Sequence, residues 1–203
     1  MSLHHQLLER QNQGRPIRVG LIGAGKFGSM YLSQIPRTPG VHLLGIADLS
    51  PQRAQDNLRL VGWPEHQTQA RSLAQALAEG STCVSDDWRA LVEHPALDVL
   101  VECTGSPPHA VEHILYAFAH GKHVVNVTVE ADAFCGPLLA RRAQAAGVVY
   151  SLAFGDQPAL ICDLVDWART CGFPVVAAGR GHKWLPHFST STPDTVWGYY
   201  GLT

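Results

Sequence analysis

The chain has 203 residues, of which 46% are hydrophobic and 16% are charged, and its formal net charge is −2. This composition is typical of a globular protein with one large domain or one and a half domains. The near-neutral charge gives no electrostatic basis for binding nucleic acid or an anionic membrane. No apolar run reaches the roughly 18 residues that span a bilayer.

The amino-terminal segment and the cysteines indicate where the protein works. Residues 1–16 lack the apolar core of a signal peptide, so export is not expected. The five cysteines form no CxxC pair, and Cys103 and Cys162 stand in apolar runs, as small core residues do. A reducing cytoplasm is the expected location.

Apolar runs typical of strands alternate along the chain with helical patterns. In the first half the predicted elements are a helix over residues 3–12, a strand over 17–22, a helix from 26 to before 36, a strand ending before 48, a helix from 51, an extra helix over 69–79, a strand at 83–84 and a helix over 87–93. In the second half they are a strand over 97–103, a helix over 109–120, a strand over 123–128, a helix over 133–146, a strand over 148–154, a helix up to 169 and a strand over 173–179. The clearest boundary signals are Ser50 as an N-cap, Pro51 behind it and Gly147 as a left-handed cap.

This alternation predicts the fold and the domains. Strands joined by helices of this length form a parallel sheet with helices on both faces. We therefore predict an α/β fold, a Rossmann-type doubly wound parallel sheet followed by the start of a second, α+β substrate domain. The predicted parts are an amino-terminal arm over residues 1–16, a dinucleotide-binding domain over 17–154 and the beginning of a catalytic domain over 155–203.

A glycine-rich turn joins the first strand to the first helix of the sheet. Its GxGxxG pattern places Gly23 at the tight turn, Gly25 where backbone approaches a pyrophosphate and Gly28 where the helix packs on the strand. The new helix directs free N–H groups and its positive dipole end to the phosphates. This turn, including Lys26 and Phe27 between the glycines, is therefore predicted to bind a dinucleotide.

The end of the second strand bears on which dinucleotide is bound. Asp48 follows Gly28 by twenty residues, at the place where a carboxylate accepts hydrogen bonds from the adenosine ribose of NAD. Arg53 lies one helical turn further on and is able to pair with the 2′-phosphate of NADP. Asp48 thus favours NAD as the cofactor, whereas Arg53 leaves NADP as an alternative.

Two later strands end in small polar residues. Thr104, Gly105 and Ser106 follow one strand, and Asn126 and Thr128 end the next. Ligands in such sheets bind outside the carboxyl ends of the strands, so these groups are candidates for the nicotinamide ribose and carboxamide. The alternative is ordinary turn chemistry.

Charged residues of the second half are candidates for substrate chemistry. Glu130, Asp132 and Asp156 suit a general acid or base, or oxygen ligands of a divalent metal. Three cations, Arg180, His182 and Lys183, suit an anionic substrate, and Lys183 is expected at the nicotinamide end of the cleft, beyond the strand over 173–179. The alternative for each charge is a solvated loop.

One short motif is set aside. His109, Glu112 and His113 fit the HxxEH pattern of zinc proteases. They follow a Gly-Ser-Pro-Pro turn inside the predicted sheet domain, with no evident third ligand, and short motifs give false positives. Zinc is therefore not predicted.

Several motifs together resemble a known family. The segments GLIGAGKFGS, ECTGSPPHA, GKHVVNVTVEAD, GDQPA, GRGHKWLP and TPDTVWGYYGLT are similar to those of the 1-deoxy-D-xylulose 5-phosphate reductoisomerase-like oxidoreductases, relatives of the homoserine dehydrogenases. The resemblance implies a homo-oligomeric enzyme of isoprenoid biosynthesis that uses NADPH and a divalent metal, Mg²⁺ or Mn²⁺, to rearrange and reduce a small phosphorylated sugar. Members are longer than this chain, so part of the active-site wall is expected to be missing.

Two other functions stay open. One is a homoserine or sugar dehydrogenase of similar fold, although the chain has Asn126-Val127 where homoserine dehydrogenases carry Asn-Lys. The other is a dinucleotide-binding module without turnover, which the short carboxyl-terminal part favours.

Overall fold

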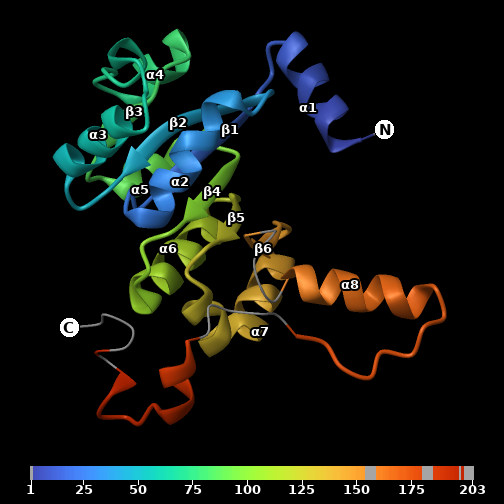
Figure 1. The fold of residues 1–203 in the computed structure, drawn as a ribbon. Helices are drawn as coiled ribbons and strands as arrows, with labels where there is room; N and C mark the ends of the chain where they lie inside the picture. The colour runs from blue at the N-terminus through green and yellow to red at the C-terminus, as the bar shows by residue number, and fades with distance from the viewer. Residues whose placement is uncertain (1, 154–158, 180–184, 197, 199–203) are drawn as a thin grey trace. The chain divides into compact units, whose positions relative to one another are not determined.

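A parallel sheet forms the centre of the first of two units into which the chain divides, Met1–Phe154 and Gly155–Thr203. The computed structural model describes residues 2–153, 159–179, 185–196 and 198. In this part of the chain six strands form one sheet in the order β3-β2-β1-β4-β5-β6 (Figure 1). The strands are β1 (Ile17–Ile22), β2 (Val41–Ala47), β3 (Cys83–Ser85), β4 (Val99–Glu102), β5 (His123–Asn126) and β6 (Tyr150–Leu152). The predicted doubly wound parallel sheet is thus confirmed, and the strand order reverses between β1 and β4.

Helices cover both faces of this sheet. The helices of the first unit are α1 (Leu3–Asn12), α2 (Lys26–Gln34), α3 (Pro51–Leu60), α4 (Leu73–Glu79), α5 (Trp88–Glu93), α6 (Pro107–Ala119) and α7 (Val129–Ala146), with short 3₁₀ turns η1 (Ile35–Arg37) and η2 (Glu65–Gln67). The α2 and α3 helices pack on one face, and α5, α6 and α7 pack on the other. Both faces of the central strands are therefore buried, which is usual for parallel sheets.

Successive residues of the central strands serve the two cores in turn. In β1, Leu21 packs with α2 and α3, whereas Ile22 packs with α5 and α6. In β4, Val101 and Leu100 divide in the same way. This follows from the two-residue period of a strand, and it explains why these strands read as unbroken apolar runs.

Local capping fixes where several helices begin and end, as the sequence predicts. The Ser50 Oγ accepts a hydrogen bond from the Arg53 N–H at 3.3 Å, and Pro51 takes the first helical position of α3. Asp87 caps α5 through the Ala90 N–H at 2.9 Å. Gly147 ends α7 with φ of 69°, a left-handed conformation that costs glycine little.

The extra helix begins later than predicted. Residues 69–72 precede α4, because Ala70 pairs with Cys83 at the edge of the sheet and Ser72 caps the helix by accepting from the Gln75 N–H at 3.1 Å. Pairing with the sheet thus competes with the helical pattern at Gln69.

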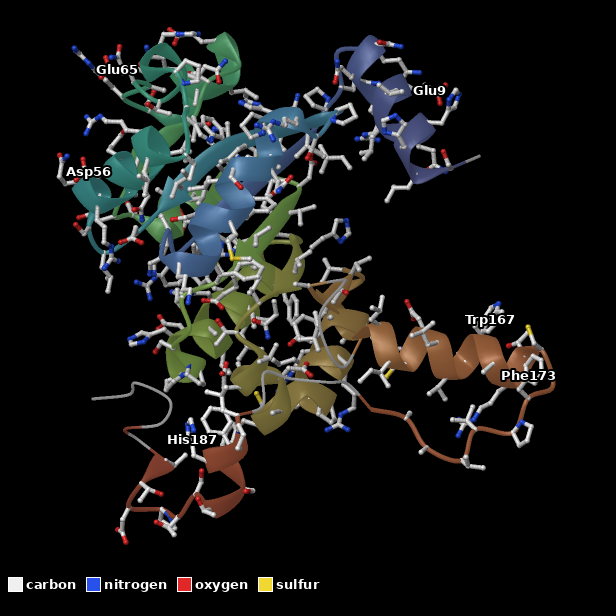
Figure 2. All side chains as sticks on the ribbon, in the orientation of Figure 1. Glu9, Asp56, Glu65, Trp167, Phe173 and His187 are labelled. Atoms are coloured by element: carbon white, nitrogen blue, oxygen red, sulfur yellow. The ribbon has the colours of Figure 1, made fainter. Side chains whose placement is uncertain are left out.

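The second unit differs from the sequence prediction at two places. Its elements within the described residues are α8 (Ala159–Thr170) and the 3₁₀ turn η3 (Pro186–Thr190). Residues 173–179 form no strand there, since no neighbouring strand pairs with them, and Val176 is 95% exposed. Cys162 is exposed rather than part of a core. Trp167 and Phe173, labelled in Figure 2, are also exposed, so this unit has little apolar packing of its own in the part described.

The described part of the chain contains no helix long and apolar enough to cross a membrane.

The central position of β1 leads to a prediction about stability. Leu21 is 0% exposed, so Leu21→Ala should lower the free energy of unfolding by about 2–5 kcal/mol, through lost burial and the cavity left behind. Leu60→Ala is the matched control, because Leu60 is 81% exposed at the end of α3, and a surface change costs within about 0.5 kcal/mol. Urea unfolding followed by circular dichroism measures both, and equal effects would contradict the assigned cores.

Candidate functional site

A pocket of about 230 Å³ lies at the carboxyl edge of the sheet, where β1 to β4 end. Its walls come from the loops that follow these strands and from the start of α5 and α6. The lining residues are Ile22, Gly23, Gly25, Ala47, Asp48, Leu49, Arg53, Asp86, Trp88, Cys103, Thr104, Ser106, His109 and His113. The pocket includes the point where the strand order reverses, which is the expected ligand position in an open α/β sheet.

The three glycines of the β1–α2 turn differ in what a side chain would meet at each position. Gly23 has φ of +95°, and a Cβ there would lie 2.8 Å from the Cys103 carbonyl oxygen. At Gly28 a Cβ would lie 2.5 Å from the Gly23 carbonyl oxygen. Gly25, by contrast, has ordinary φ of −73°, and among the described residues no atom lies within 4 Å of its Cβ position. Protein packing requires the first and third glycines, whereas the second faces open space in the pocket.

The N-terminus of α2 faces the same turn. Gly25 is the N-cap, and no side chain in the described part of the chain caps this end. The first N–H groups of an α-helix have no partner within the helix. A helix end of this kind attracts an anion through its N–H groups and its dipole.

Asp48 connects the turn after β1 with the turn after β2. Its Oδ2 accepts a hydrogen bond from the Ala24 N–H at 2.8 Å, and its Oδ1 accepts from the Ser50 N–H at 2.9 Å. The Arg53 guanidinium donates to the same Oδ1 at 2.8 Å. Three hydrogen bonds within the protein therefore already use this carboxylate, whose side chain is 3% exposed. Asp48 braces the glycine turn, a role beyond the predicted contact with ribose.

Arg53 presents a cation at the rim of the pocket. Its side chain is 60% exposed, in contrast to the buried carboxylate with which it pairs. An ion pair this exposed on one side is weak and is easily exchanged for another partner. The guanidinium is thus placed to reach an anionic group beside Asp48.

Cys103 closes the floor of the pocket behind Gly23. Burial, followed by the nearby Glu102 and Asp48 carboxylates, raises the pKa of its thiol above the ordinary value. The thiol therefore keeps its proton and donates to the Gly23 carbonyl oxygen at 2.7 Å. Cys103 therefore holds the turn in place through this contact.

Asn126 lies in the interior and is not among the residues that line the pocket. Its side chain is fully buried; its Nδ2 donates to the Thr128 carbonyl at 3.1 Å and to the Tyr150 Oη at 3.2 Å, and its Oδ1 accepts from the Thr128 N–H. These contacts shape the turn between β5 and α7.

Asp132 also has a partner inside the protein. The Tyr150 hydroxyl donates to Asp132 Oδ1 at 2.9 Å. Burial raises the pKa of Tyr150 above its ordinary value, so the phenol keeps the proton that it donates. Gly136 leaves room for the Asp132 carboxylate, since a Cβ at Gly136 would lie 2.6 Å from it.

Besides Asp132, the predicted site residues divide according to where they lie relative to the pocket. The pocket brings together Gly23, Gly25, Asp48, Arg53, Thr104 and Ser106. The remaining candidates Lys26, Phe27, Gly28, Gly105 and Asn126 adjoin it or lie behind it, whereas Glu130 is exposed on α7. Asp156, Arg180, His182 and Lys183 lie outside the described residues.

A metal site does not form among the residues that the structure describes, because no three His, Cys, Asp or Glu side chains come together there. His109 and His113, set aside as zinc ligands, line the pocket instead. His113 also contacts the Trp88 ring edge-on, with ring centroids 4.5 Å apart.

Sequence reasoning missed a further set of pocket residues. They are Leu49, Asp86, Trp88, His109 and His113, together with the buried Glu102 behind the wall. The rule that nominated Thr104 also applies to Asp86 and Trp88, which follow β3. No sequence pattern marks Glu102 as part of the site, because a single carboxylate at the end of an apolar strand does not reveal its hydrogen-bond partners.

Sheet order, glycine turn and pocket define a Rossmann-type domain. Residues 23–152 match the family model of the homoserine dehydrogenase NAD binding domain, and residues 155–200 match the model of the oxidoreductase DRL catalytic domain. The first match covers more than half of the chain. The chain therefore belongs to the homoserine dehydrogenase NAD binding domain family.

Individual relatives match over half to two thirds of this chain. The chain is 33% identical over 107 residues to glycosyl hydrolase family 109 protein 1 of Phocaeicola vulgatus, covering 53% of this chain and 21% of that protein. It is 31% identical over 115 residues to the homoserine dehydrogenase of Methylobacillus glycogenes, covering 55% and 24%. The solved homoserine dehydrogenase of Thiobacillus denitrificans superposes with a TM-score of 0.52 at 26% identity, over 68% of this chain and 29% of that one. The chain thus spans about a fifth to a quarter of the curated relatives it matches.

These matches support only part of the predicted resemblance. Both family descriptions name oxidoreductase or dehydrogenase proteins, and neither names 1-deoxy-D-xylulose 5-phosphate. The relationship to homoserine dehydrogenases is confirmed, and the reductoisomerase assignment has no support from them.

The difference in packing around Gly28 and Gly25 leads to a prediction about stability. Gly28→Ala places a Cβ against a backbone oxygen and should cost about 1–3 kcal/mol of stability. Gly25→Ala points into open space and should change stability by less than about 0.5 kcal/mol. Thermal unfolding of the two variants measures this difference. Equal losses would show that packing and not a ligand requires Gly25.

Proposed function

We propose that the protein is the cofactor-binding part of an NAD(P)-dependent oxidoreductase. The observation that carries the proposal is the open space at Gly25 beside the uncapped start of α2. A packing role explains Gly23 and Gly28 but not the absence of a side chain at Gly25. A pyrophosphate lying over that backbone explains it, because a Cβ would occupy the same space.

The residues present suit a dinucleotide. The glycine turn and the first N–H groups of α2 would hold the pyrophosphate. The adenosine ribose would lie beside Asp48 and Arg53, and the nicotinamide ribose beside Thr104 and Ser106. When bound, a nicotinamide cofactor supplies or accepts a hydride, while the protein supplies orientation and electrostatics.

Asp48 and Arg53 together would admit either cofactor. Asp48 repels a 2′-phosphate, yet its charge is partly neutralised by Arg53 at 2.8 Å. If Arg53 turns towards a 2′-phosphate, it gives up an ion pair that is 60% exposed on its side and gains a phosphate contact.

The substrate is a separate proposal. Homoserine is named by matched relatives, and the motif resemblance suggests 1-deoxy-D-xylulose 5-phosphate with a divalent metal. Two assays of the full-length enzyme, each with and without Mg²⁺, distinguish them: homoserine, an alcohol, would reduce NAD⁺ or NADP⁺, whereas 1-deoxy-D-xylulose 5-phosphate, a ketone, would oxidise NADH or NADPH.

A dinucleotide-binding module without turnover is the second candidate. It is favoured by the exposed apolar residues Trp167, Phe173 and Val176, which leave the second unit with little packing of its own in the part described. Cofactor binding by this chain, with neither reduction of NAD(P)⁺ by homoserine nor oxidation of NAD(P)H by the sugar phosphate, would support it.

Loss of the open space at Gly25 tests cofactor binding. Gly25→Val should abolish binding of NADH and NADPH, because the branched side chain fills the pyrophosphate position, while the protein stays folded. Fluorescence titration measures the affinities and circular dichroism checks the fold. Unchanged affinity in a folded variant would contradict the proposed cofactor site.

The Asp48 brace leads to a prediction about cofactor choice. Asp48→Ala removes the contact with Ala24 and should weaken both cofactors, but NADH more than NADPH, by about tenfold in the ratio of dissociation constants. NADPH loses less because Arg53 becomes free for its 2′-phosphate. Asp56→Ala is the matched control, an exposed acid on α3 (Figure 2). A preferential loss of NADPH would refute the assigned role.

A further inference from the structure

Glu102 is a buried carboxylate at the edge of the sheet that forms the pocket. It ends β4, and its side chain is 0% exposed. Its ionic partner in the described part of the chain is His113, whose Nδ1 lies 3.4 Å from Oε1. A carboxylate removed from water is costly unless hydrogen bonds satisfy it. The groups that donate to it therefore show which part of the structure depends on it.

One carboxylate oxygen holds Thr104 directly, and Ser106 through Thr104, in the loop after β4. The Thr104 N–H and Oγ1 donate to Glu102 Oε1 at 3.2 and 2.6 Å. The Ser106 N–H in turn donates to Thr104 Oγ1 at 3.3 Å.

The other oxygen holds Gly105 through the Thr128 hydroxyl. Thr128 Oγ1 donates to Glu102 Oε2 at 2.5 Å and accepts from the Gly105 N–H at 3.1 Å. All three backbone N–H groups of the loop over 104–106 are thus fixed by Glu102, directly or through one threonine. Thr128 is 1% exposed, so this hydroxyl belongs to the interior as well.

The loop belongs to one half of the sheet. Glu102 pairs with Ile22 of β1 and with Asn126 of β5, at the border between the two halves. In doubly wound sheets each half binds one mononucleotide. The glycine turn and Asp48 belong to the half with β2 and β3. The loop held by Glu102 belongs to the other half, which by this rule would take the nicotinamide nucleotide.

We propose that Glu102 is a positioning residue for the nicotinamide half of the cofactor. This inference rests on the dinucleotide function proposed above. Glu102 does not line the pocket, whereas Thr104 and Ser106 do. It acts through them by keeping the loop in its binding geometry before the cofactor arrives, so that binding does not have to order the loop.

The substitution Glu102→Gln disturbs this network at nearly constant shape. If the amide nitrogen faces Thr104, two donors meet a third donor. If it faces Thr128, the hydroxyl must accept from both the amide and Gly105, and its own proton loses its acceptor. Either orientation leaves a buried polar group unsatisfied. Thr128→Val provides a second variant that keeps the carboxylate and releases only Gly105 and Oε2.

The experiment compares whole cofactors with their adenosine fragments. Calorimetry measures binding of NADH and ADP, and of NADPH and adenosine 2′,5′-bisphosphate, to wild type and both variants. For the dinucleotide that wild type binds more tightly, both variants should weaken binding by about tenfold or more. The matching fragment, which lacks the nicotinamide nucleotide, should bind as in wild type. Thr82→Val is the control, because it removes another buried hydroxyl, which donates to the Leu43 carbonyl at 2.7 Å.

Each contrary result has a distinct meaning. Equal weakening of dinucleotide and fragment would show a general structural role and overturn the inference, as would unchanged dinucleotide affinity in both variants. If Glu102→Gln does not fold, Thr128→Val decides by the same comparison. A folded wild-type protein that binds neither NADH nor NADPH would overturn the proposed function and this inference together.

Discussion

The approach of the β1–α2 turn to the end of β4 is the constraint on which this structure depends. A side chain at Gly23 would meet the Cys103 carbonyl at 2.8 Å, and one at Gly28 would meet the Gly23 carbonyl at 2.5 Å. Only glycine at these two positions lets the turn and α2 approach the sheet this closely, which brings the N-terminus of α2 to the strand ends. The same approach leaves the backbone of Gly25 facing the pocket, so close packing and an open binding surface have one origin.

Two buried carboxylates support the two sides of this pocket in different ways. Asp48 ties the glycine turn to the start of α3 through Ala24 and Ser50. Glu102 fixes the loop after β4 through Thr104 and Thr128. Asp48 has an exposed cation, Arg53, beside it, whereas Glu102 is enclosed by hydroxyl and amide donors. In each case hydrogen bonds from the loop offset the cost of burying the carboxylate. The same hydrogen bonds fix the conformation of the loop.

The sequence was sufficient for the sheet, the glycine turn and the position of Asp48, because these depend on local periodicity and on spacing along the chain. It was not sufficient for interactions between distant segments. Glu102 and Thr128 meet only because β4 and β5 are neighbours, and Asn126 proved to face inwards because its amide has partners on both sides. The strand predicted over residues 173–179 failed for the same reason, since an extended apolar segment needs a neighbouring strand that periodicity does not supply.

Mapping the bound cofactor onto the backbone tests the central claim most directly. In an NMR titration of the isotope-labelled chain with NADH or NADPH, the amide signals of Ala24 to Gly28 should shift most, followed by those of Asp48 to Ser50 and of Thr104 to Ser106. The amides of Arg18 and His42, near the opposite ends of the same strands, should stay in place. Shifts centred on that opposite edge, or no shifts at saturating cofactor, would contradict the account.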